Sequence, residues 1–121
     1  MNKFRLAKLM AKHSTCNPQV GAVIYRGSTV IGVGFNKIKS HPKLANEDRF
    51  YSLHAEMSAI INAKQDLKGC SIYVYREFKD GNVALSKPCN LCMPSIIESG
   101  ITKIYYTDDK SETGYSKIKV N

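Results

Sequence analysis

The sequence predicts an α/β domain built in layers, with a sheet that is partly parallel. Segments with helical periodicity alternate with short β-rich segments along the 121 residues, and a tight turn joins the first two β-rich segments. Strands joined through a helix pair in parallel, whereas strands joined by a tight turn pair antiparallel. At this length we expect residues 1–121 to form one domain.

The first half of the chain predicts a helix, a hairpin and a loop. Over residues 2–13, apolar side chains lie between basic ones, which indicates an amphipathic helix. Two β-rich runs, 20–25 and 29–35, flank a turn at Gly27 and indicate a hairpin. Residues 36–52 are polar and have no sustained period, so we expect a long loop of the kind that carries function.

The second half predicts two helices, each followed by a strand. Apolar residues three or four apart indicate helices over 54–65 and 89–99. The apolar runs 71–75 and 103–107 indicate buried strands, which we expect to pair in parallel. From Asp108 onward the chain is polar, and we expect a tail.

Charge and hydropathy limit the partners and the location of the protein. Eighteen Lys and Arg against ten Asp and Glu give a formal net charge of +8, which favours anionic partners such as nucleotides or nucleic acid. The longest apolar runs are too short to span a membrane, so we expect no membrane partner. The N-terminus lacks the unbroken apolar core of a signal peptide, so we expect a cytoplasmic protein.

Two short motifs, each at the start of a predicted helix, carry the residues suited to chemistry. They are His54-Ala55-Glu56 and Pro88-Cys89-Asn90-Leu91-Cys92. In an intracellular chain, cysteines indicate a metal site or catalysis rather than disulfides. One histidine and two thiolates make three zinc ligands, and a three-ligand site leaves the fourth position for water, as catalytic zinc sites do. The motifs therefore predict a catalytic zinc site.

Glu56 lies two residues beyond the predicted histidine ligand, so its side chain leaves the same turn in another direction. A carboxylate there can take a proton from a water at the zinc ion and pass it to a substrate. A zinc-activated water and a carboxylate that transfers protons suit the hydrolytic removal of an amine from an aromatic ring. Two alternatives fit the motifs less well. A structural zinc site would need a fourth ligand, and none is obvious in the sequence. A thioredoxin-like redox pair at Cys89 and Cys92 would leave the His-x-Glu motif unexplained.

The spacing of these motifs resembles the zinc-dependent cytidine and deoxycytidylate deaminase superfamily, whose signature is H-x-E followed by P-C-x-x-C. The similarity extends to residues 14–24, to Gly32-Val-Gly-Phe-Asn36 and to 99–106, and the pattern is most similar to deoxycytidylate deaminases. One departure is Pro94, because relatives usually have a good helix former there. If the helix began after Asn90, that proline would remove an early helix hydrogen bond.

The resemblance implies a three-layer α/β/α domain with a central mixed sheet, a zinc cofactor and assembly into homo-oligomers. It implies His54, Cys89 and Cys92 as zinc ligands and Glu56 as the proton shuttle. For the substrate it implies four further residues: Asn36 at the sugar or base, the Ala55 N–H at the base carbonyl, and Val20 and Ala22 at the floor of the base pocket.

The leading hypothesis is hydrolytic deamination of a free cytosine nucleotide, dCMP to dUMP, with release of ammonia. A monophosphate needs a facing cation, and Arg49, followed by Lys43, is the candidate in the loop over 36–52. The alternative enzyme acts on cytosine or adenine within single-stranded DNA or RNA, which the positive charge and Arg49-Phe50-Tyr51 favour. A third reading is a zinc-stabilised binding module without activity.

Overall fold

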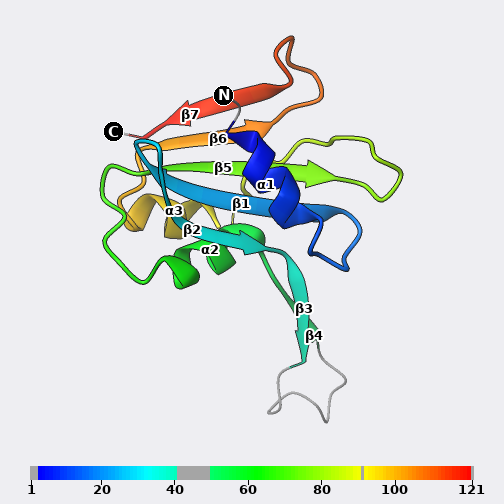
Figure 1. The fold of residues 1–121 in the computed structure, drawn as a ribbon, viewed down its shortest axis with the longest axis horizontal. Coiled ribbons are helices and arrows are strands. Elements are labelled where there is room, and N and C mark those ends of the chain that lie inside the picture. Colours follow the sequence, from blue (N-terminus) through cyan, green and yellow to red (C-terminus); the bar gives the residue numbers. More distant parts are fainter. Residues whose placement is uncertain (1–2, 41–49, 91, 121) are drawn as a thin grey trace.

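The computed structural model describes residues 3–40, 50–90 and 92–120. Within them, five strands form a mixed sheet in the order β2-β1-β5-β6-β7 (Figure 1). β1 (Gln19–Arg26) pairs antiparallel with β2 (Thr29–Phe35) and with β5 (Ser71–Glu77). β5 pairs in parallel with β6 (Lys103–Thr107), which confirms the partly parallel sheet.

Helices cover both faces of this sheet and complete the three layers. α1 (Phe4–Ala11) lies on one face, where Ala7 and Ala11 pack with Val23, Tyr25 and Tyr75. α2 (Ala55–Ala63) and α3 (Met93–Glu98) lie on the other face, over the larger apolar cluster (Figure 1). The predicted α/β/α layering is therefore correct.

Two segments contain strands where the sequence indicated none. In the expected loop 36–52, β3 (Lys37–Ser40) pairs antiparallel with β4 (Phe50–Leu53). In the expected polar tail, β7 (Tyr115–Lys119) pairs antiparallel with β6 at the edge of the sheet. Both strands depend on backbone pairing with a neighbouring strand rather than on an apolar pattern of their own, and an edge strand can be polar on its exposed positions.

α2 lies unusually close to β2 because glycines face it. A Cβ atom on Gly34 would stand 2.4 Å from the Ala59 nitrogen and 2.7 Å from the Ala55 oxygen. At Gly32 it would stand 2.6 Å from the Ala59 oxygen. These contacts are with backbone, which cannot rotate away as a flexible side chain can. The glycines therefore set the distance between the sheet and the first turn of α2.

A buried carboxylate ties α1 to β5 on the opposite face. Glu77 is 4% exposed, pairs with Lys12 and accepts a hydrogen bond of 2.5 Å from the Tyr75 hydroxyl. Burial raises the pKa of Glu77, but the hydrogen bonds from Lys12 and Tyr75 outweigh it and leave the pKa below its usual value.

Within the described residues, no helix is long and apolar enough to cross a membrane.

Replacing Gly34 with alanine tests the close approach of α2. We expect Gly34→Ala to lower the free energy of unfolding by about 1–3 kcal/mol, because the added methyl group must push the helix away. Val30→Ala on the same strand is the control, since Val30 is 44% exposed and its truncation should stay within about 0.5 kcal/mol. Urea unfolding of both variants measures this, and equal stability of Gly34→Ala and wild type would contradict the account.

Candidate active site

The first part of the site lies where β4 leads into α2. His54 is the N-cap residue of that helix and has an extended backbone (φ −70°, ψ 149°), so its side chain lies before the first helical turn. Glu56 lies inside that turn, where the helix dipole favours a carboxylate. The His54 carbonyl accepts the Ser58 N–H at 3.0 Å, which closes the turn. The motif therefore places an imidazole and a carboxylate at one helix start.

Glu56 is almost completely enclosed, with 6% of its surface exposed. Burial is the main influence and raises the pKa of its carboxyl. A hydrogen bond from its own backbone and the nearby His54 and Arg76 act in the opposite direction, and the pKa remains raised. Burial thus makes this carboxyl group hold a proton more readily than an exposed one, which suits it to proton transfer.

The second part of the site is the turn that precedes α3. The Cys89 carbonyl accepts the N–H groups of Cys92 at 3.1 Å and Met93 at 2.9 Å, so the turn brings both cysteines to one side. The helix was predicted to begin at Cys89, but its N-cap is Cys92 and its first residue is Met93. Pro94 is consequently in the first turn, where an N–H has no intrahelical partner, and it removes no helix hydrogen bond.

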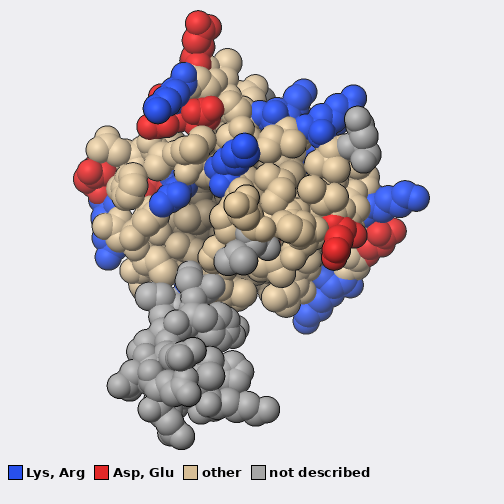
Figure 2. Space-filling view, turned by 180° about the vertical axis from the view of Figure 1, so that it is seen from behind, with Lys and Arg blue, Asp and Glu red and all other residues tan. Residues whose placement is uncertain are grey.

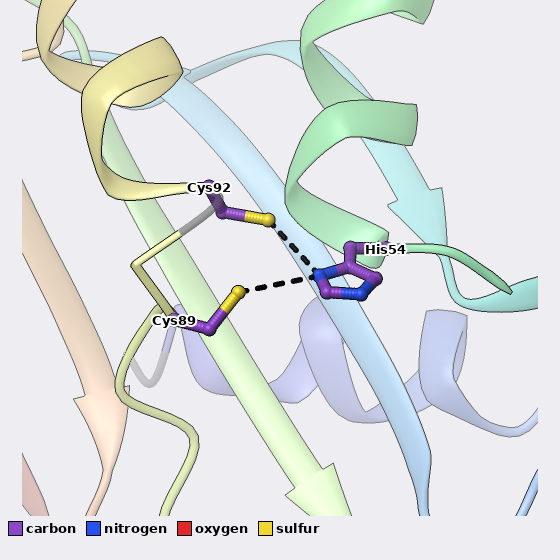
Figure 3. A group of neighbouring side chains, drawn as sticks. All are labelled: His54, Cys89 and Cys92. Atoms are coloured by element: carbon purple, nitrogen blue, oxygen red, sulfur yellow. Dashed lines mark hydrogen bonds between the residues drawn. The ribbon is translucent and has the colours of Figure 1, made fainter.

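The two parts meet at the imidazole of His54 (Figure 3). Its Nδ1 lies 3.1 Å from the Cys92 Sγ and 3.6 Å from the Cys89 Sγ. One ligand atom from each of the three residues lies within 4.8 Å of the others. Cys92 is buried, and this burial, together with the charge of Glu56, raises the pKa of its thiol.

This donor set fits zinc. A sulfur and a nitrogen ligand at ordinary Zn–S and Zn–N distances in tetrahedral geometry stand about 3.6 Å apart. The His54 Nδ1–Cys89 Sγ separation of 3.6 Å equals this value, and the His54 Nδ1–Cys92 Sγ separation of 3.1 Å is shorter. One nitrogen and two sulfur donors are also the set that zinc prefers over calcium or magnesium. Among the described residues, the cluster offers three protein ligands and no fourth. That number is typical of catalytic zinc sites.

A cavity of about 210 Å³ opens beside the ligands. Its wall is formed by both site motifs, by residues at the start of β1 and just after β2, and by β5 and the segment that follows it. Its lining residues are Pro18, Val20, Asn36, His54, Ala55, Glu56, Arg76, Ser86, Lys87 and Cys89.

Several residues expected at the substrate line this cavity. Val20, Asn36 and Ala55 do so, whereas Ala22 is fully buried in the core under α2 and is not part of the lining. The Asn36 amide is held by backbone groups: its Oδ1 accepts the Val20 N–H at 2.8 Å, and its Nδ2 donates to the Pro18 carbonyl at 3.0 Å. In the part of the chain that the structure describes, one lone pair and one N–H of this amide have no partner and can bond a ligand.

Other lining residues were not identified from the sequence. Arg76 and Lys87 bring two cations to the cavity. In the sequence each is a single basic residue outside any motif, so neither was recognised as a site residue. The cations that were identified, Lys43 and Arg49, lie outside the described residues. The signal that could have indicated Arg76 is its position directly after the apolar run 71–75, near the C-terminal end of β5.

Comparison with known proteins was consistent with this geometry. A family profile described as the cytidine and deoxycytidylate deaminase zinc-binding region matches residues 2–108. An uncharacterized deaminase from the luxG 3′ region of Aliivibrio fischeri is 34% identical over 98% of this chain and 80% of its own length. Human deoxycytidylate deaminase is 33% identical over 78% of this chain, which spans 55% of the human protein.

Among solved structures, the apo dCMP deaminase of cyanophage S-TIM5 superimposes with a TM-score of 0.66 at 21% identity. The match covers 89% of this chain and 81% of the phage chain. At this identity it supports the fold.

Zinc binding should depend on the three ligands. We expect the protein to bind one zinc ion, and Cys89→Ser to weaken zinc affinity more than about 100-fold, because loss of a ligand should exceed the about 10–100-fold cost of losing an outer hydrogen bond. Cys16→Ser is the matched control and should bind zinc as wild type does, since Cys16 is not part of the cluster. Competition with a chromophoric chelator measures the affinity. Undiminished affinity in Cys89→Ser would contradict the assignment.

Proposed function

The chain belongs to the cytidine and deoxycytidylate deaminase family of zinc-binding hydrolases, and on that basis we propose that it converts free dCMP to dUMP with release of ammonia. The observation that carries the proposal is the buried carboxylate of Glu56 beside a three-ligand zinc cluster, both at one cavity. The human relative named deoxycytidylate deaminase supports the choice of nucleotide.

In this proposal the chain's residues hold the metal and move the protons. His54, Cys89 and Cys92 hold zinc, which when bound lowers the pKa of water and supplies a nucleophile at neutral pH. Glu56 would accept one proton from the attacking water and deliver it to the ring nitrogen next to the amine, and would then take the second proton from the hydroxyl group added to the ring and deliver it to the leaving amine. Its enclosure keeps bulk water from exchanging these protons.

Three groups would orient the pyrimidine nucleoside. The Ala55 N–H starts α2 and has no intrahelical partner, so it can donate to the base carbonyl. The free positions of the Asn36 amide can bond a sugar hydroxyl or the base. Val20 offers an apolar contact from β1 at the floor of the cavity.

The second candidate function is deamination of cytosine or adenine in a single strand. The net charge of +8 favours it. On the face drawn in Figure 2, however, the Lys and Arg side chains of the described residues are scattered and interrupted by Asp and Glu. The described residues on that face therefore form no continuous basic groove of the kind that tracks a strand. We therefore propose the free nucleotide.

The homo-oligomer implied by the resemblance is also a proposal. Ile61 on α2 is 56% exposed and Ile97 on α3 is 46% exposed, so the helical layer presents apolar side chains outward. Sedimentation of the zinc-loaded protein measures the state of assembly, and a monomer at micromolar concentration would contradict it.

Loss of the carboxylate should abolish turnover while the metal stays bound. We expect Glu56→Gln to lower kcat for dCMP by about 10²–10⁴-fold, because an amide cannot accept and release the protons. Glu98→Gln, at an exposed carboxylate on α3, is the control and should keep wild-type kcat. Ammonia release together with zinc content measures the effect. A Glu56→Gln protein that holds zinc and turns over normally would refute the mechanism.

A substrate panel separates the two candidate functions. We expect kcat/KM for dCMP to exceed that for a cytosine-containing oligonucleotide and for adenosine nucleotides. Ammonia release from each compound at equal zinc loading measures this. Preference for the oligonucleotide would favour the single-strand deaminase, and zinc binding without ammonia from any compound would favour a binding module.

A further inference from the structure

Arg76 presents an unsatisfied donor at the active-site cavity. Its Nε is buried and has no hydrogen-bond partner among residues 3–40, 50–90 and 92–120. Its Nη1 makes a long contact of 3.4 Å with the Leu85 carbonyl, and the guanidinium lies 5.9 Å from the Phe78 ring centre. Within the described ranges, no carboxylate forms an ion pair with it. Buried donors are normally paired, so this guanidinium is suited to an anion that the described residues do not bond to it, since Glu56 acts on it only through its charge.

The segment from Phe78 to Lys87 brings a second cation to the same cavity. It folds back on β5, because the Arg76 carbonyl accepts the Ala84 N–H at 3.0 Å. The Ser86 hydroxyl donates to the Val74 carbonyl at 2.7 Å and accepts the Thr107 N–H at 2.7 Å.

These bonds occupy the Ser86 hydroxyl, so Ser86 anchors the segment rather than binding a ligand. Lys87 follows directly, lines the cavity, and makes no hydrogen bond or ion pair within the described part of the chain. The anchor that positions the cysteine turn thus positions Lys87 as well.

The charges of the lining select the ligand. Arg76 and Lys87 are its cations and Glu56 is its carboxylate, while two thiolates neutralise the charge of a bound zinc ion. A phosphate monoester carries a charge near −2 at neutral pH, which two cations match. A guanidinium also binds two phosphate oxygens in parallel, which an ammonium does not.

We infer that Arg76 and Lys87 bind the 5′-phosphate monoester of the substrate, with Arg76 as the main contact. The inference rests on the proposed function, since it assigns the phosphate of that nucleotide. It differs from the prediction that Arg49 or Lys43 binds phosphate, and it comes from an unpaired donor at the cavity rather than from composition.

Binding of the product pair tests the inference without turnover. Titration calorimetry with dUMP and deoxyuridine is done on zinc-loaded wild type, Arg76→Gln, Lys87→Gln and the control Lys79→Gln, an exposed cation outside the cavity lining. We expect Arg76→Gln to weaken dUMP binding about 10–100-fold and to leave deoxyuridine within about twofold. Lys87→Gln should weaken dUMP to a smaller extent, and Lys79→Gln should change neither.

Other results would overturn the inference. Equal losses for dUMP and deoxyuridine would show that Arg76 acts on the base or on the fold. Unchanged dUMP binding in both variants, with a loss in Arg49→Gln, would move the phosphate to the other loop. Tighter binding of an oligonucleotide than of dUMP, lost in Arg76→Gln, would make the ligand a phosphodiester.

Two further arms keep the result interpretable. If Arg76→Gln does not fold, the dUMP affinities of Lys87→Gln and Arg76→Lys test the phosphate site instead. Lys87 is exposed, so its replacement should not disturb folding, and Arg76→Lys keeps the positive charge. Wild-type turnover of dCMP is measured separately. Selective dUMP binding without dCMP turnover would uphold the phosphate site and refute the proposed function, so the two failures are distinguishable.

Discussion

The close contact between α2 and β2 is the constraint on which the site depends. Gly32 and Gly34 leave no room for a Cβ atom, so the backbone of the helix rests on the backbone of the strand. The first turn of α2 is held by this contact, and His54 and Glu56 begin that turn. A small shift of the helix would move the imidazole and the carboxylate together, and catalytic groups tolerate only small displacements.

The other half of the site is positioned by a separate set of bonds. Ser86 joins β5 to β6 through the Val74 carbonyl and the Thr107 N–H, and the chain then continues into the cysteine turn. The parallel pairing of β5 and β6 therefore determines where the thiols lie. Two independently held chain segments meet at His54 Nδ1, which explains how three ligands far apart in sequence converge.

The sequence predicted the elements with a clear apolar pattern and the metal cluster, and it missed elements and residues that lack such a pattern. The helix at the N-terminus, the first hairpin and β6 follow from periodicity and turn chemistry, and the two motifs indicated the metal cluster before any coordinates. β7 was missed because an edge strand buries little and depends on its partner, β6. Arg76 was missed for a similar reason: one cation within β5 has no pattern, and its importance comes from the cavity that it lines.

The most direct test of the account is the electron density of the zinc-loaded protein with bound dUMP, measured with anomalous scattering at the zinc edge. We predict one anomalous peak within about 2.0–2.3 Å of His54 Nδ1 and the two Sγ atoms, with no fourth protein ligand. The pyrimidine should lie against Glu56 and the phosphate against Arg76. A fourth protein ligand at the metal, or a nucleotide bound away from Glu56, would contradict it.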